Sequence, residues 1–324
     1  MKSLISLPIW TTLLFGTNKI LLKLINLACG QTFHSNWINL DQSASSKEVR
    51  FHDLRTPLPF PDDYADAIYC SHFLEHLDES QGTAFLRECY RCLNNKGVLR
   101  IVVPDFERLA QDYLDIVRQL HESANLETEH QWMHLEIFDQ FSRKRPEGKM
   151  GTFLNDSENN KNSFIRNRLG LSIDNFRNNN DSVTKSEPQS IPVGFFRSVR
   201  KFFFDSAYRT HFLMKKICPK HFKVFSIYPS ESFLNEIILM FSSLTYKEMK
   251  EAMFRNSGEV HQQSFDQFKL KRLLLDIGFC EASKKTAVES SIENWTSYGL
   301  DTSPEGFEKK TDSLYMEAFK SLQI

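Results

Sequence analysis

The sequence predicts an α/β protein built on a mostly parallel β-sheet. Short apolar segments alternate with turns or helices, which is typical of a parallel sheet, and they lie near residues 24–28, 37–40, 48–52, 66–70 and 98–103. A helix is predicted near 79–93, where apolar side chains recur at spacings of three and four. Residues 108–142 also have a helical pattern, Phe268–Ile277 forms a helix closed by Gly278, and two more strands follow at about 281–288 and 313–319.

The first three strands each end on a small or acidic residue. The first runs into a tight turn that contains Ala28 and Gly30, the second ends on Asp41, and the third ends on Asp53. The carboxyl ends of parallel strands lie at one edge of the sheet, where nucleotides bind. These strand ends therefore predict a crevice for an adenosine-containing cofactor. Because the link between the first two strands is very short, the helix expected there is reduced to a turn or two.

Five motifs in order carry a family resemblance. They read LINLACG over 24–30, WINLD over 37–41, DL followed by LPFPD over 53–62, SHFLEH over 71–76 and RCLNNKG over 91–97. Together they resemble class I S-adenosylmethionine-dependent methyltransferases, in the bacterial branch with LNLGCG, WINLD, LPFPD and SHxLEH. The resemblance is dense over 24–113 and resumes at 132–150 and at about 251–320. It implies a Rossmann-like methyltransferase fold, a mostly parallel seven-stranded sheet flanked by helices, with an antiparallel last strand and a helical insertion.

The resemblance also implies S-adenosyl-L-methionine as the cofactor and assigns residues to it. Small residues leave room for its methionine end, an acid accepts hydrogen bonds from both ribose hydroxyls, and a second acid with its neighbour meets the adenine. Ala28 and Gly30 would leave room for the methionine end, Asp41 would bind the ribose, and Asp53 with Leu54 would meet the adenine. Ser71 and His72 would lie at the edge of the cofactor. Relatives have Gly where Ala28 stands. The alternatives are an ordinary turn after the first strand and acids that only cap turns.

Two histidines are candidate bases on the acceptor side, His76 and His261. Relatives read H-x-W-M-Y-D where this chain has His261 to Asp266 as HQQSFD, which indicates a changed acceptor pocket. The alternatives are a packed helical residue for His76 and a helix cap for the segment of His261.

Two metal or redox alternatives are weaker. His72 to His76 match the H-x-x-E-H zinc-hydrolase motif, but that motif needs a longer helix and a third ligand, and here it follows a short strand. The predicted reaction is therefore metal-independent, with no metal ligands assigned. Cys89 and Cys92 form a C-x-x-C at the end of the predicted helix, which lacks the helix amino terminus that activates redox cysteines.

The predicted organisation has four parts. Residues 1–150 form the cofactor-binding core, 151–193 a mobile low-complexity insertion, 194–257 a helical cap, and 258–324 the remaining core. Within the cap, residues 195–223 are basic and rich in Phe, which indicates either peripheral membrane contact, binding of a phosphorylated substrate, or an exposed helical cap with its Phe face inward.

Composition narrows the function. The net charge of -1 over 324 residues argues against bulk nucleic-acid binding, and six irregularly spaced cysteines favour a reducing cytoplasm. Residues 4–15 imitate a signal-peptide core without a cleavage site, so we expect no export. The sequence thus predicts a cytoplasmic enzyme that methylates a small-molecule or glycan-like acceptor. The alternative is a catalytically inert methyltransferase-fold protein that binds cofactor or lipid.

Overall fold

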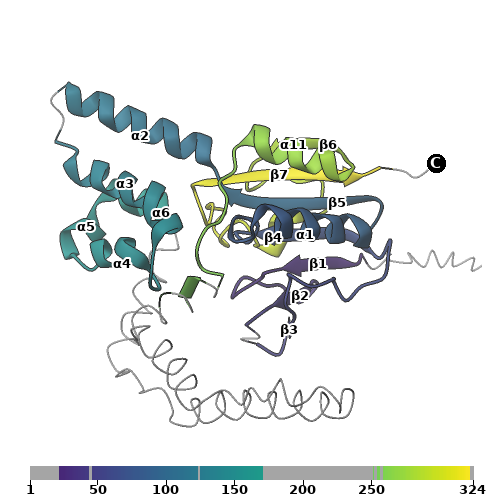
Figure 1. The fold of residues 1–324 in the computed structure, drawn as a ribbon. Helices are drawn as coiled ribbons and strands as arrows, with labels where there is room; N and C mark the ends of the chain where they lie inside the picture. Colours follow the sequence, from purple (N-terminus) through teal and green to yellow (C-terminus); the bar gives the residue numbers. More distant parts are fainter. Residues whose placement is uncertain are drawn as a thin grey trace, which may run out of the picture.

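The protein is described here by a computed structural model that covers residues 22–43, 46–122, 125–170, 251, 254–255 and 258–321. A seven-stranded sheet in the order β3-β2-β1-β4-β5-β7-β6 forms its centre (Figure 1). Only β7 runs antiparallel, to both β5 and β6, and the other neighbours are parallel. The predicted fold is confirmed. The strands are β1 Leu24–Leu27, β2 Ile38–Asp41, β3 Val49–Phe51, β4 Ala65–Ser71, β5 Leu93–Pro104, β6 Phe279–Lys285 and β7 Ser313–Lys320.

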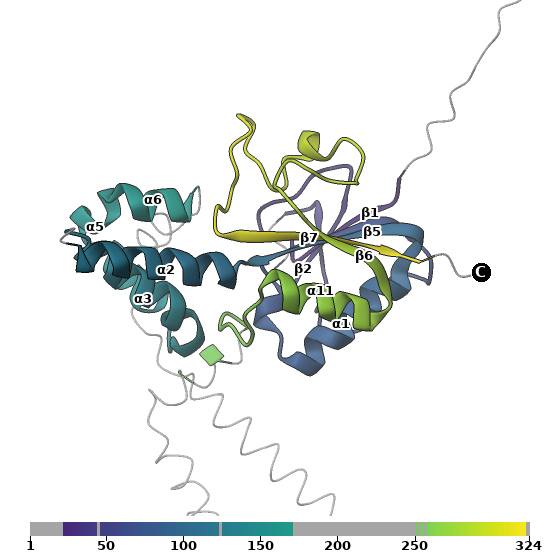
Figure 2. The same ribbon diagram turned by 90° about the horizontal axis from the view of Figure 1, so that it is seen from above.

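Two helices, α1 (Glu79–Cys92) and α11 (Gln267–Ile277), cover one face of the sheet (Figure 2). Their apolar sides pack on the strands in one buried cluster. Asp78 begins α1 with a capping box that includes Gln81, and Gly278 ends α11 with a left-handed φ of 117°. Both helices agree with the sequence prediction to within a residue or two.

The opposite face is covered by the excursion between β6 and β7, which contains the short helix η2 (Trp295–Tyr298). The excursion is attached by Arg100 of β5, which is fully buried. Its guanidinium lies 2.7 Å from Asp301 and 2.9 Å from Glu317. Breaking such a buried ion pair costs several kcal/mol, ~3–5 in typical cases, so Arg100 holds the excursion on the sheet.

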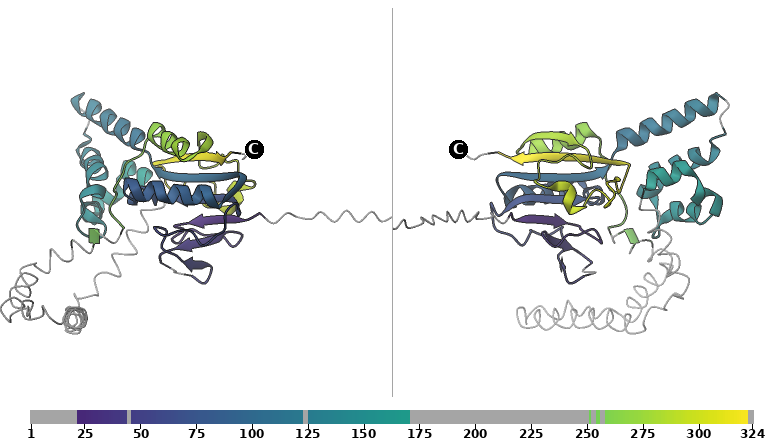
Figure 3. Two further views of the ribbon diagram at one scale, coloured as in Figure 1. Left: turned by 45° about the vertical axis from the view of Figure 1, so that its right-hand side comes forward. Right: turned by 180° about the vertical axis from the view of Figure 1, so that it is seen from behind.

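Five helices lie beyond the carboxyl ends of the parallel strands (Figures 1 and 3). They share a core of their own that includes Trp132, Met133, Leu154 and Ile165. The helices are α2 Phe106–His121, α3 Glu127–Ser142, α4 Gly148–Leu154, α5 Ser157–Lys161 and α6 Ser163–Leu169.

Residues 151–170, which the sequence assigned to a mobile low-complexity insertion, lie largely in the helices α4, α5 and α6, and their mobility stays a prediction. The polar residues there begin helices: Asp156 accepts hydrogen bonds from the amides of α5, and Asn162 does so for α6. The caps let Leu154 and Ile165 become buried. The domain boundaries remain a prediction, and residues 171–250, with the basic segment 195–223, lie outside the described residues.

Among the described helices, none is both long and apolar enough to cross a membrane. The signal-like segment 4–15 lies outside the described residues.

Candidate active site

The turn after β1 has an unusual backbone conformation. Ala28 and Gly30 both have a φ of 53°, in the left-handed region that favours glycine. The chain then reaches β2 without a helix over residues 28–37, as the short link predicted. The left-handed φ would suit the Gly that the resemblance expects where Ala28 stands.

Asp41, at the end of β2, lies beside this turn. One of its carboxylate oxygens accepts a hydrogen bond from the backbone amide of Gly30 at 2.8 Å. The other accepts hydrogen bonds from the amide of Ser43 at 2.7 Å and from its hydroxyl at 2.8 Å. The predicted position of Asp41 next to Gly30 is confirmed, whereas its contact with a ribose stays a prediction.

Asp53 follows β3 and is held by its neighbour Arg55. The guanidinium donates to both carboxylate oxygens at 2.9 Å, and the Arg55 amide adds a bond of 3.1 Å. The hydrogen bond from the Arg55 side chain holds the pKa of Asp53 below its usual value. The next residue, Leu54, is buried. The adenine contact assigned to this pair stays a prediction.

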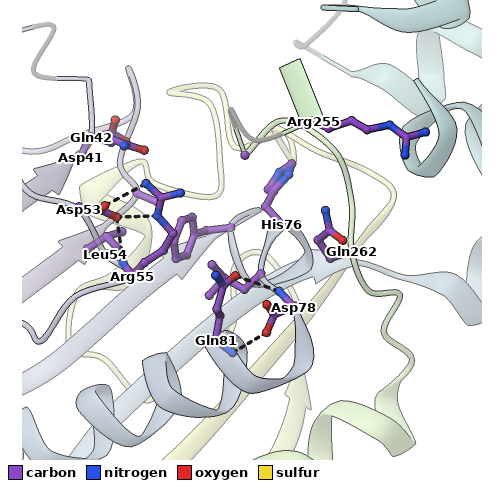
Figure 4. A pocket seen from close by; sticks show the side chains of 14 residues that line it. Asp41, Gln42, Asp53, Leu54, Arg55, His76, Asp78, Gln81, Arg255 and Gln262 are labelled. Atoms are coloured by element: carbon purple, nitrogen blue, oxygen red, sulfur yellow. Dashed lines mark hydrogen bonds and ion pairs between the residues drawn. The ribbon is translucent and has the colours of Figure 1, made fainter. Parts of the chain in front are cut away.

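These strand ends line a cavity of about 370 Å³. We call Ala28, Asp41, Asp53 and Leu54 the cofactor wall. Asp41 and Asp53 lie at one side of the cavity, and His76 and Gln262 lie at the other (Figure 4). The remaining predicted residues, Gly30, Ser71, His72 and His261, are not among those that line it.

A second group of side chains, Glu75, His76 and His261, lies behind this opposite side, and we call it the histidine cluster. Its potential ligand atoms all lie within 4.8 Å of one another. The amides of Gln262 and Gln263 donate to the carbonyl of Glu75 at 2.7 and 3.1 Å, which brings His261 to the turn at Leu74–His76. The rings of His76 and His261 meet edge to face, with centroids 4.8 Å apart.

Glu75 is the buried charge of the cluster, with 1% of its surface exposed. Burial acts to raise its pKa, but His72, His76 and His261 outweigh this and hold it at about 2. Burial lowers the pKa of His261 to about 3 and also lowers that of His76. At neutral pH the cluster therefore holds one carboxylate among neutral imidazoles.

His72 borders the cluster from the end of β4. Its φ of 52° turns the chain out of the strand, its Nε2 lies 2.9 Å from the Ser313 hydroxyl, and its Nδ1 lies 3.4 Å from Glu75 Oε1. Since Leu74–His76 is only a 3₁₀ turn, the segment lacks the helix that the zinc-hydrolase motif requires. The redox alternative also lacks support, because Cys89 and Cys92 are buried and burial raises the pKa of both thiols.

Glu75 is the residue that the sequence analysis left without a role in a methyltransferase. The sequence signal that could have identified it is its position between the apolar residues Leu74 and Leu77, which are both buried in the structure. An acid in such a setting is rarely buried without a partner.

Part of the chain is similar to known proteins. Residues 25–101 match the family model described as a methyltransferase domain. No curated protein matches the chain. Among solved structures, a SAM-dependent methyltransferase from Archaeoglobus fulgidus is 22% identical, with 29% of this chain and 51% of that chain covered and a TM-score of 0.24. A SAM-dependent methyltransferase from Mesorhizobium loti is 18% identical, with 26% of this chain and 47% of that chain covered and a TM-score of 0.21.

The chain spans about half of the length of these solved structures, 51% and 47%. The family match supports the prediction of a methyltransferase domain over residues 25–101. The assignment to one bacterial branch stays a prediction.

Proposed function

We propose that this chain transfers the methyl group of S-adenosyl-L-methionine to a hydroxyl of a small-molecule or glycan-like acceptor. One observation carries the proposal: a single cavity at the carboxyl edge of the sheet is lined by the cofactor wall and, on its other side, by His76. Cofactor and acceptor would then meet in one space, as a direct transfer requires.

On the cofactor wall, Asp41 would bind the ribose. A carboxylate offers about four acceptor positions, and the Gly30 amide and the Ser43 amide and hydroxyl use three of them. A ribose hydroxyl would take the remaining position, and a second one would replace the Ser43 hydroxyl. Asp53 and Leu54 would contact the adenine.

The transfer would be one displacement step. The bond from the acceptor oxygen to the methyl carbon forms while the sulfur–methyl bond breaks, and S-adenosylhomocysteine leaves as a neutral molecule. The sulfonium needs no metal to leave, which suits the metal-independent reaction that the sequence predicts. The acceptor hydroxyl must lose its proton, and a neutral imidazole can accept it. His76 at the cavity is the first candidate base, and His261 is the second.

Calorimetry with S-adenosyl-L-methionine tests the cofactor site. Hydrogen bonds to a charged group contribute about 1.5–3 kcal/mol each, so Asp41→Ala should bind the cofactor about 10–100-fold more weakly. Ser43→Ala is the matched control: it removes a hydroxyl beside Asp41 but leaves the carboxylate, so its affinity should stay within about threefold of wild type. Equal binding by wild type and Asp41→Ala would show that the ribose lies elsewhere.

Turnover separates the enzyme from the inert alternative. The chain is incubated with methyl-labelled cofactor and a cell extract, and label in a product excludes an inert binding protein. The inert alternative was motivated in part by Ala28, which stands where the family pattern has Gly. This reason is weaker in the structure, because Ala28 adopts the left-handed conformation that suits glycine.

The acceptor class, a cytoplasmic location and membrane contact through residues 195–223 are part of the proposal. The net charge of -1 supports the expectation of no nucleic-acid partner. Co-sedimentation with vesicles of anionic lipid tests the membrane contact, and a chain that stays in the supernatant would exclude it.

A further inference from the structure

Glu75 has an unusual environment for a carboxylate. It is 1% exposed, and among the described residues neither of its oxygens accepts a hydrogen bond of good geometry; the imidazole nitrogens His72 Nδ1 and His76 Nε2 lie 3.4 and 3.9 Å from Oε1. The Nδ1 atom of His76 is buried and unpartnered in the same way. A buried polar group without a partner costs about 1–3 kcal/mol, and a charged one costs more. Such groups are rare in folded proteins and usually mark an ion, water or ligand.

The atoms around Glu75 have the spacing of a metal site that can close. The ligand atoms of Glu75, His76 and His261 lie within 4.8 Å of one another. Two ligands on a tetrahedral Zn²⁺ ion lie about 3.4 Å apart, given metal–ligand distances of about 2.1 Å. Side-chain rotations that move the ligand atoms by about 1 Å would therefore bring all three within bonding distance of one ion.

We propose that Glu75, His76 and His261 bind a divalent transition-metal ion of the Zn²⁺ type. Two imidazoles and one carboxylate are a donor set that such ions prefer, and three protein ligands leave one position open. The cation would supply the close contact that the Glu75 carboxylate lacks, since its nearest donor, His72 Nδ1, is 3.4 Å away.

His72 suits the role of an outer partner for this site. Its Nε2 bonds the Ser313 hydroxyl at 2.9 Å, which fixes the ring, and its Nδ1 lies 3.4 Å from Glu75 Oε1. Groups that orient metal ligands in this way typically contribute to affinity.

The place of the site gives the ion a use. This use, unlike the binding, rests on the proposed methyl transfer, but it replaces the metal-independent histidine base of that proposal with the ion. His76 lines the cavity, so the open position of the ion would face the acceptor. An acceptor hydroxyl bound there would have a lower pKa and would release its proton to water before it attacks the methyl group. His76 and His261 would then act as ligands rather than as bases.

The chain contains a matched control in His130 and His134 of α3. Their rings also meet edge to face, with centroids 4.6 Å apart and planes at 78°. His134 is exposed, and within the described residues the histidine cluster is the only group of three or more acidic, His or Cys side chains placed for a metal.

The test is zinc binding by the full chain after treatment with a chelator and dialysis, measured by calorimetry. Wild type should bind one Zn²⁺ that Glu75→Gln and His261→Ala lose, whereas the double variant His130→Ala, His134→Ala should retain it. Loss of an outer partner typically costs about 10–100-fold in affinity, and loss of a direct ligand should exceed this. Circular dichroism verifies the fold of each variant, and His261→Ala alone decides if Glu75→Gln does not fold.

Two results would overturn the site: no zinc bound by wild type, or zinc binding by Glu75→Gln and His261→Ala that equals that of wild type. Titration of the zinc-free chain with S-adenosyl-L-methionine separates this proposal from the proposed function. Cofactor binding without any zinc binding rejects the metal site alone, whereas zinc binding with the expected losses supports the site even if the cofactor does not bind.

Discussion

The two sides of the cavity place carboxylates in opposite situations. On the cofactor wall, the carboxylates of Asp41 and Asp53 are hydrogen-bonded by residues close to them, and both remain partly open to solvent. On the other side, Glu75 is buried, and its oxygens have no hydrogen bond from the described residues. The cofactor wall is thus complete before any ligand binds, whereas the histidine cluster is not.

This difference suggests how the two sides divide the work. A preformed wall loses little freedom when it binds a cofactor, which favours affinity. The buried Glu75 carboxylate, by contrast, would be stabilised by any group that donates a hydrogen bond or a positive charge to it. The histidine cluster should therefore respond to protons, cations and bound hydroxyls. Changes in the cluster should therefore affect chemistry, and changes in the cofactor wall should affect binding and stability.

The largest expected effect is on turnover in His76→Ala. This side chain is a direct participant as a base or as a ligand, and loss of acid–base catalysis typically costs about 10²–10⁴-fold. We expect the rate of label transfer to fall by that factor, while calorimetry gives a cofactor affinity within about threefold of wild type, since the cofactor wall is unchanged.

His134→Ala is the control for this change, because His134 belongs to an edge-to-face pair on the exposed surface of α3. Its rate should equal that of wild type. Retained turnover in His76→Ala would remove the functional difference between the two sides of the cavity.

An intermediate effect is expected on stability at acidic pH, in chelator-treated protein. Burial lowers the pKa of His261 from 6.5 to about 3 in the folded chain. Between these values the unfolded chain binds more protons, so the contribution is complete above pH 6.5 and is lost as the pH falls toward 3. One proton corresponds to at most about 1.4 kcal/mol per pH unit. Urea unfolding should show wild type losing about 1–2 kcal/mol more than His261→Gln between pH 6.5 and 5.

His134→Gln should follow the wild-type pH dependence, which separates His261 from a general effect of removing a histidine. Glu75 contributes with the same sign, but only below its unfolded pKa of 4.5, since its folded value is about 2. Parallel curves for wild type and His261→Gln would mean that His261 is as hydrated in the folded chain as in the unfolded one.

The cofactor wall was predictable because its signals are local. The end of each strand is marked by a small or acidic residue after an apolar segment. Because β1 and β2 are neighbours in the sheet, Asp41 lies beside the turn at Gly30. The helices α1 and α11 followed from apolar spacing, and the end of α11 followed from Gly278.

The histidine cluster was not predictable in the same way. His261 reaches Glu75 through backbone hydrogen bonds from Gln262 and Gln263, and such bonds leave no pattern in side chains. Both histidines were selected as candidates, but the sequence did not show that they would meet beside a buried Glu75. The helices that begin at Asp156 and Asn162 were not predicted for a related reason, since composition alone does not distinguish helix caps from a polar linker.

The smallest expected effect concerns the backbone of the turn after β1, in the pair Ala28→Gly and Gly30→Ala. Both positions have a φ of 53°, and a Cβ added at Gly30 would meet nothing within 4 Å. Left-handed backbone costs a residue with a Cβ about 1–2 kcal/mol, so Gly30→Ala should lose about 1 kcal/mol of unfolding free energy. Ala28→Gly relieves the same strain but gains freedom in the unfolded chain, which leaves a gain of about 0.5 kcal/mol. Urea unfolding measures both. Opposite signs would locate the strain in the turn itself, whereas a loss in both variants would mean that the Ala28 methyl group contributes more by packing than its backbone costs.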